Sequence, residues 1–262
     1  MKTSSQVRAL GHPTGRPEGN LLVSPATTPP GSWPVLAAQL FNERMLDSTN
    51  LFPCVFGVDA VRKETLRYAF IPNGSQRVPV LAEALRQFTD IAESLGRRTS
   101  LVCFFEFDPR LDSMEKHREH FWSLLRDVSA TDMATWPEDI SQDFDDPTWE
   151  YSYNSTPMFV VANTPYHVDR RSRYFEYFAI TFQPRFVFDD LKGGTATGDN
   201  ARKVIRDRLA KYDTAERTPL LGSFGEAGNK EWEQYFLSDD NEPNPPGARC
   251  PIAHAKISEP TS

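Results

Sequence analysis

The chain has 262 residues, of which 39% are hydrophobic and 25% charged, and this composition fits one globular domain with a sizeable core. Its net charge of −7 argues against a general nucleic-acid or membrane-surface binder, because such proteins need a basic face. The three cysteines, Cys54, Cys103 and Cys250, form no Cys-x-x-Cys pair, which indicates neither a disulfide framework nor a structural zinc site and predicts a cytoplasmic location.

Composition also divides the chain into three parts. Residues 1–33 are rich in Pro, Gly, Ser and Thr without apolar periodicity, which predicts a flexible leader. Residues 34–240 carry the periodic apolar pattern of an ordered domain, and residues 241–262 form a Pro-rich tail with Cys250 and His254. The start of the chain lacks the apolar segment of a signal peptide, and no apolar run approaches a membrane span, so we expect no membrane attachment.

Hydrophobic periodicity predicts the secondary structure of the domain. Helices are predicted at about Val35–Asp47, Pro79–Leu95, Ser113–Val128 and Asn200–Lys211. Strands are predicted at Leu66–Ile71, Leu101–Phe105, Trp149–Tyr153, Met158–Asn163, Tyr177–Phe182 and Arg185–Phe188, the third and fourth joined as a hairpin. Residues 51–58, broken by Pro53 and Gly57, predict a loop packed on the core. The order of the elements predicts an α+β single domain with a mixed, largely antiparallel sheet flanked by helices.

Two motifs point to common ligand sites and are rejected. Residues 193–200 resemble a phosphate-binding loop but lack the Lys-Ser/Thr pair that reaches the phosphates and magnesium, so they predict a helix entry capped by Thr197 or Asp199. His117 and His120 share one helix face, but the chain contains no Glu-x-x-His motif, which argues against a di-iron bundle.

The stretch Asn163–Arg185 has the composition of a haem site. Haem needs an axial ligand, apolar walls and cations for its propionates. His167 offers a ligand, and it lies among the cations Arg170, Arg171, Arg173 and Arg185 and the aromatic residues Tyr174, Phe175, Phe178 and Phe182. A thiolate from Cys54 or Cys250 is the rival ligand. The alternative is a non-haem Fe(II) site with His167, Asp169 and, as the second histidine, His254 in the tail.

A set of short motifs in order along the chain resembles the YqcI/YcgG family. The resemblance covers about Leu51–Pro251 and is carried by Phe52-Pro53-Cys54, Leu66-Arg67-Tyr68, Trp136-Pro137, Thr164-Pro165-x-His167, Arg171-Ser172-Arg173-Tyr174-Phe175, Pro184-Arg185-x-Val187-Phe188, Tyr212-Asp213, Glu231-Trp232-x-Gln234-Tyr235 and Cys250-Pro251. Family members of known activity are haem-dependent N-oxygenases of natural-product pathways that hydroxylate guanidine nitrogens.

The resemblance therefore implies a haem-dependent N-hydroxylase that converts L-arginine to Nω-hydroxy-L-arginine in antibiotic biosynthesis of the D-cycloserine type. It implies haem b, O₂ and an external electron donor or reductase, and a homodimer is compatible with it. We expect His167 to bind the iron, with Cys54 as the rival, and Arg171, Arg173 and Arg185 to lie near the propionates.

A guanidinium substrate calls for a carboxylate, and Glu150 and Glu106 are the candidates. The alternative function is a haem-binding sensor or carrier without turnover.

Overall fold

A computed structural model describes residues 31–191, 195–222 and 228–241 of the chain. The predicted tails, with Cys250 and His254, therefore lie almost wholly outside the described residues. Within them the chain folds around one five-stranded sheet whose strand order is β1-β2-β5-β4-β3. The strands are β1 (Arg67–Ile71), β2 (Leu101–Phe105), β3 (Tyr151–Tyr153), β4 (Thr156–Asn163) and β5 (Ala179–Pro184). Only the β1–β2 pair is parallel, so the predicted α+β domain with a mixed, largely antiparallel sheet is confirmed.

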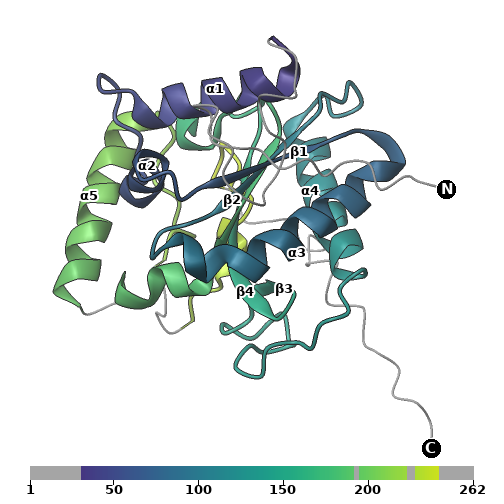
Figure 1. Cartoon of the computed structure of the whole chain (residues 1–262). Helices are drawn as coiled ribbons and strands as arrows, with labels where there is room; N and C mark the ends of the chain where they lie inside the picture. The colour runs from purple at the N-terminus through teal and green to yellow at the C-terminus, as the bar shows by residue number, and fades with distance from the viewer. Residues whose placement is uncertain (1–30, 192–194, 223–227, 242–262) are drawn as a thin grey trace, which may run out of the picture.

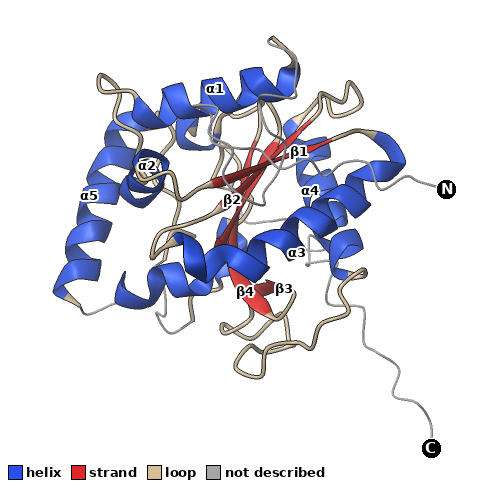
Figure 2. Ribbon diagram, viewed as in Figure 1, coloured by secondary structure: helices blue, strands red, loops and turns tan. Residues whose placement is uncertain are grey.

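Helices cover both faces of this sheet (Figures 1 and 2). On one face lie α3 (Arg77–Leu95), which connects the parallel strands, and α4 (Met114–Ser129). On the other lie α1 (Trp33–Leu46), α2 (Val55–Arg62) and α5 (Ala196–Tyr212). The predicted helices at α1, α3, α4 and α5 are confirmed, each to within a few residues at its ends.

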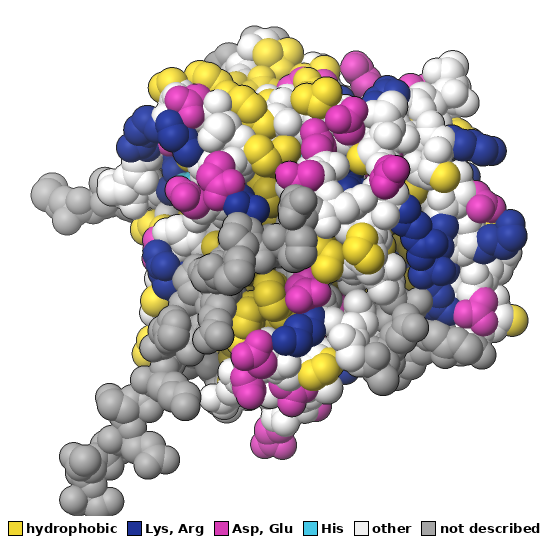
Figure 3. All heavy atoms as spheres, turned by 180° about the vertical axis from the view of Figure 1, so that it is seen from behind, with side chains coloured by type: hydrophobic (Ala, Val, Ile, Leu, Met, Phe, Trp, Pro, Cys, Tyr) yellow, Lys and Arg dark blue, Asp and Glu magenta, His cyan; other side chains and the backbone are white. Residues whose placement is uncertain are grey.

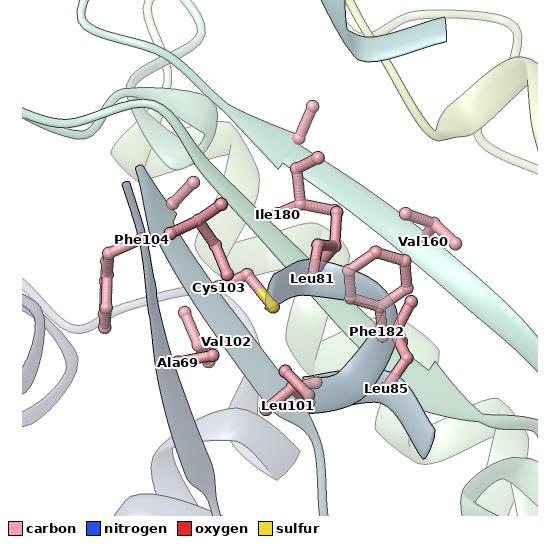
Figure 4. Close-up of a cluster of buried hydrophobic side chains, with 14 of the residues drawn as sticks. Ala69, Leu81, Leu85, Leu101, Val102, Cys103, Phe104, Val160, Ile180 and Phe182 are labelled. Carbon is pink, nitrogen blue, oxygen red and sulfur yellow. The ribbon is translucent and has the colours of Figure 1, made fainter. Parts of the chain in front are cut away.

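The face under α3 and α4 is tightly filled. Figure 4 shows Leu81 and Leu85 of α3 beside Cys103, Ile180 and Phe182 of the sheet, and all five side chains are fully buried. Burying aliphatic and aromatic side chains is worth roughly 1.5–3 kcal/mol for each one, so this layer supplies much of the stability of the domain.

The opposite face of the sheet is incompletely covered. Along β4 and β5 the side chains that face α3 are buried, whereas the alternate ones, including Val161, Thr181 and Gln183, are only half-buried. The strand register places Tyr68, Val102, Thr181 and Val161 in one row across the sheet. Tyr68 and Val102 of this row are buried, whereas Thr181 and Val161 are still partly accessible under α1, α2 and α5. The helices therefore leave a space over this part of the sheet.

Two predicted elements are wrong. Residues 51–58 were expected to form a loop, but α2 begins at Val55, with Cys54 as its N-cap residue. The predicted strand at Arg185–Phe188 is instead a 3₁₀ helix, η4 (Arg185–Leu191). The β4–β5 pairing ends with Pro184 opposite Met158. The next residue of β4 on that side is Pro157, which has no backbone N–H to continue the ladder.

Side-chain caps and turns define the remaining boundaries. The Thr195 hydroxyl accepts a hydrogen bond from Gly198 N at 3.1 Å, so α5 starts at Ala196, and the predicted caps Thr197 and Asp199 are wrong. The β3–β4 hairpin turns through Asn154 and Ser155, both at positive φ (51° and 55°), as a tight hairpin of matching twist requires.

The surface mixes acidic and basic side chains. In the view from behind (Figure 3), apolar side chains gather at the top, where α1 lies, and Leu36 and Leu46 of that helix are exposed. In the part of the chain that the structure describes, no helix has the length and apolar character needed to span a membrane.

Candidate functional site

A cavity of about 350 Å³ lies between the open face of the sheet and helices α1, α2 and α5. Its walls are mostly apolar, and the aromatic and aliphatic residues that line it come from every surrounding element: Phe41, Met45, Phe52, Phe56, Val102, Phe159, Val161, Phe175, Phe188, Leu191, Ile205 and Leu209. Ligand sites are typically apolar clefts with a few polar groups that fix orientation. The cavity therefore matches the general form of a small-molecule or cofactor site.

Cys54 lines this cavity at the start of α2. Its Sγ accepts a hydrogen bond from Gly57 N at 3.3 Å, and it lies at the positive end of the helix dipole, which favours a thiolate. Burial raises the pKa of the Cys54 thiol, whereas the backbone N–H groups of Gly57 and Phe56 and the charges of Arg173 and Arg98 lower it. The thiol is thus held with one face toward donors and another toward the cavity.

Gly57 lies close to the Met45 side chain and to the thiol. A Cβ built at residue 57 would lie 2.8 Å from Met45 Cε and 3.5 Å from Cys54 Sγ. The first distance is too short for a real contact, so a side chain at residue 57 would require the flexible end of Met45 to move aside. The glycine therefore leaves room for the Met45 side chain between α1 and α2 beside the thiol.

Two guanidinium groups reach the same cavity, the buried one of Arg173 and the half-buried one of Arg44. Arg173 donates from Nη2 to Gln234 O at 3.1 Å, but its buried Nη1 has no hydrogen-bond partner among the described residues. Burial lowers the pKa of Arg173 to about 10, helped by the charge of Arg170, so the group stays cationic at neutral pH. Arg44 forms an ion pair with Glu176 at 2.9 Å, and its Nε is likewise buried without a partner in the described structure. Unsatisfied buried donors are costly, and here they border a space that can hold an anion.

His167 lies outside the cavity, in a loop at the edge of the sheet. Its Nε2 is 2.7 Å from Leu237 O and its Nδ1 is 3.0 Å from the Thr164 hydroxyl. Because a carbonyl only accepts, Nε2 carries the proton and Nδ1 accepts from Thr164. Burial lowers the pKa of His167 to about 4, which keeps this neutral form at physiological pH.

The surrounding loop is held as firmly as the histidine. The carboxylate of Asp239 accepts hydrogen bonds from the backbone N–H groups of Val168, Asp169 and Arg170 at 2.7, 3.1 and 2.9 Å. Arg170 donates from Nε to Ser238 O at 2.7 Å. His167 therefore belongs to a clamp that fastens residues 237–239 to the loop, and the structure does not place it where it could bind a ligand in the cavity.

Two of the arginines predicted to lie near the propionates, Arg171 and Arg185, are also outside the cavity. Arg171 lies with its guanidinium 5.5 Å from the centre of the Tyr212 ring, and Arg185 forms ion pairs with Asp139 at 3.1 Å and Glu150 at 3.4 Å. Neither lines the cavity. Of the seven residues predicted for the site, the structure brings together Cys54 and Arg173 there.

The two predicted carboxylates also lie elsewhere. Glu106 accepts a hydrogen bond from Asn73 N at 2.9 Å and borders a small crevice of about 20 Å³ beside His117 and His120. Glu150 is buried next to Arg185, and burial raises its pKa to about 7 although the Arg185 charge acts in the opposite direction. The carboxylate that does line the cavity is that of Glu231, which sequence reasoning found only as part of a family motif.

The geometry gives little support to a non-haem iron site. The Asp169 carboxylate accepts a hydrogen bond from the Thr214 hydroxyl at 2.8 Å, while His167 is turned toward Leu237 and Thr164. Within the described ranges, no three His, Cys, Asp or Glu side chains converge as metal ligands do. The third residue of that hypothesis, His254, falls outside the described residues.

Comparisons with known proteins agree with the sequence motifs. The model of the YqcI/YcgG family matches residues 41–253. The uncharacterized proteins YcgG and YqcI of Bacillus subtilis (strain 168) are each 39% identical to the chain, over 86% of it and 89% of YcgG, and over 87% of it and 91% of YqcI. A Streptomyces lavendulae protein named as the putative N(omega)-hydroxy-L-arginine synthase DcsA is 32% identical over 72% of the chain and 74% of its own length. No solved structure matches the chain.

Proposed function

Since the chain belongs to the YqcI/YcgG family, we propose that it is a haem-dependent N-oxygenase that hydroxylates a guanidine nitrogen, with L-arginine as the expected substrate. The relative named as an N(omega)-hydroxy-L-arginine synthase supports the reaction and the substrate. The observation that carries the proposal for this chain is the Cys54 thiol, which meets an apolar cavity beside Arg173, whose Nη1 has no hydrogen-bond partner among the described residues.

The residues around the cavity fit haem. A haem site needs a ligand for iron, apolar walls for the macrocycle and cations for the propionates. Cys54 offers the ligand, and the aromatic and aliphatic lining offers the walls. Arg173 Nη1 and Arg44 Nε are buried donors with no partner in the described part of the chain. We therefore transfer the ligand role expected for His167 to Cys54 and retain Arg173 as a propionate partner.

The position of Cys54 suits a thiolate ligand in particular. Hydrogen bonds from backbone N–H groups and nearby cations stabilise sulfur in its anionic form, and Gly57, Phe56 and Arg173 act on Cys54 in this way. Coordination to the haem iron would deprotonate the thiol and so would offset the effect of burial on the pKa of Cys54. When bound, haem supplies the redox chemistry, and a thiolate ligand favours O–O cleavage.

The chain's own contribution is to bind the substrate and orient it. The half-buried side chains of β4 and β5 form the floor of the cavity and α1, α2 and α5 form its walls, so a guanidine held there lies against mostly apolar side chains. The reaction converts one N–H bond of the guanidine to N–OH. It consumes one O₂ with two electrons and two protons and releases one water, and an external donor supplies the electrons.

Reconstitution tests this proposal directly. The purified chain, supplied with haem, should show a Soret band. With O₂, reductant and L-arginine it should form a product one oxygen atom heavier than arginine, detected by mass spectrometry. Omission of the reductant is the control. Absence of the Soret band even after haem is supplied overturns the proposal. A Soret band without product favours instead the haem-binding carrier or sensor, which the same cavity could serve.

A further inference from the structure

We propose that Glu231 is the residue that binds the guanidinium group of the substrate. This assignment rests on the proposed function and adds to it the side chain that recognises the substrate. A planar guanidinium pairs best with a carboxylate, because two parallel N–H···O hydrogen bonds fix its orientation as well as its charge. The candidates from the sequence, Glu150 and Glu106, do not line the cavity.

Glu231 is the acidic residue of the cavity wall. Among the described residues that border the cavity, every other side chain that is charged at neutral pH is a cation: Arg44, Arg173 and Arg202. Glu231 is also 7% exposed. A carboxylate at the surface of a mostly apolar cavity interacts more strongly with a cationic ligand than one in water does.

The local structure explains why Glu231 faces the cavity. It begins the 3₁₀ helix η5 (Glu231–Gln234), and residues three apart in a 3₁₀ helix lie on the same side. Glu231 and Gln234 accordingly both line the cavity. Trp232 and Tyr235 share the other side and pack into the aromatic core.

That aromatic packing makes the carboxylate's support rigid. The Trp232 ring lies 4.1 Å from Phe144 and 6.2 Å from Trp122, centre to centre. The Tyr235 hydroxyl donates to Met158 O at 3.0 Å. A short helix anchored on one side by such contacts holds the side chains of its other side in a defined place, as a site that must orient one nitrogen for reaction requires.

The charges around the cavity fit an anionic cofactor together with a cationic substrate. Arg44 and Arg173, the proposed propionate partners, favour anions, whereas Glu231 favours a cation. A substrate whose guanidinium meets Glu231 is thereby held at the end that reacts. An uncharged urea in place of the guanidinium would lose the ionic part of this contact.

L-Arginine and L-citrulline provide the test, because they differ only in having a guanidinium or a neutral urea. Binding of each to the haem-supplemented protein is measured by equilibrium dialysis for wild type, Glu231→Gln and Glu231→Asp. The matched control is Glu150→Gln, which neutralises a buried carboxylate away from the cavity. Wild type should prefer arginine. In Glu231→Gln the arginine affinity should fall about 10- to 100-fold, as expected for loss of a charged hydrogen-bonded pair, while citrulline binding changes little.

The outcomes separate this inference from the proposed function. If Glu231→Gln weakens both ligands equally, or leaves the preference for arginine intact, the inference is wrong even where haem binding and turnover are normal. Equal binding of the two ligands by wild type also overturns it. Absence of a Soret band and of product in wild type, with the arginine preference lost only in Glu231→Gln, overturns the proposed function and leaves the substrate site standing. Glu231→Asp keeps the charge, so it should retain a preference for arginine.

Discussion

The loop around His167 and the start of α2 at Cys54 each place a potential metal ligand near arginines. The two regions differ in whether their buried polar groups have hydrogen-bond partners. At the loop both nitrogens of His167 are hydrogen-bonded, and Asp239 accepts from three consecutive backbone N–H groups. At the cavity, donors on Arg173 and Arg44 have no partner among the described residues, and the space beside them is lined by apolar side chains.

Buried polar groups with hydrogen-bond partners stabilise the fold, whereas buried donors without such partners beside the cavity are available to a ligand. When all hydrogen bonds of a buried polar group are formed, they offset its desolvation cost and rigidify the structure. One that is unsatisfied beside a cavity costs free energy until something binds. The basic run is divided accordingly: Arg170 fastens the loop to residues 238 and 241, whereas Arg173, three residues later, reaches the cavity.

Replacing Cys54 should have the largest effect. We expect Cys54→Ala to lose the thiolate-type spectrum of bound haem and nearly all turnover, because no other described thiol lines the cavity. Absorption spectra of the reduced CO complex provide the measurement. Cys103→Ala is the control, since that thiol is fully buried on the opposite side of the sheet beside α3. A thiolate spectrum that survives Cys54→Ala would mean that the ligand lies elsewhere.

Replacing His167 should instead affect stability. His167→Ala leaves the buried Leu237 carbonyl without its donor and should lower the free energy of unfolding by about 2–4 kcal/mol, while the folded fraction keeps the wild-type haem spectrum. Thr164→Val removes only the Nδ1 hydrogen bond and should cost less, about 1 kcal/mol. Denaturant titration measures both. Loss of haem from a stably folded His167 variant would return the ligand role to this histidine.

The pH dependence of the free energy of unfolding tests the structural role of His167 in a second way. The folded pKa of His167 is about 4, below its ordinary value of about 6.5, so the unfolded chain takes up the proton first as the pH falls. Stability is therefore lost between pH 6.5 and 4, by up to about 3 kcal/mol from this group. His120, whose pKa burial also lowers to about 4, adds a similar slope. Removing His167 should reduce the acid sensitivity of unfolding without abolishing it.

Sequence patterns predict most of the fold because they report burial. The continuous apolar run Leu101–Phe105 identifies the central strand, and helical spacing in Pro79–Leu95 identifies α3, which packs on it. The helix at α2 escapes prediction because Pro53 and Gly57 are usually helix breakers. Here Pro53 precedes the N-cap and Gly57 permits the close approach of Met45. Both roles depend on tertiary structure.

The candidate site is predicted only in part, because sequence shows which groups are near one another but not where they point. His167 and Arg173 stand six residues apart in one basic, aromatic stretch, yet one faces the clamp and the other the cavity. Cys54, Arg173 and Glu231 come from segments more than fifty residues apart and meet only through the sheet. A feature that could have indicated Glu231 is the spacing Glu231-Trp232-x-Gln234-Tyr235, in which polar and aromatic residues each recur every three positions.

Replacing Arg173 should have the smallest effect, and it tests whether this arginine contributes to haem binding more than to the stability of the fold. Arg173→Lys keeps the charge but loses the forked donors, so haem affinity should fall about tenfold, the loss expected for one charged hydrogen bond. The stability of the haem-free protein should change less, because only the contact with Gln234 O is removed. Arg171→Lys is the matched control, since Arg171 belongs to the same run but lies over the Tyr212 ring. Haem titration of the two variants measures the difference. Equal losses in both would mean that the basic run acts as one unit through the fold, and the distinction drawn between its members would fail.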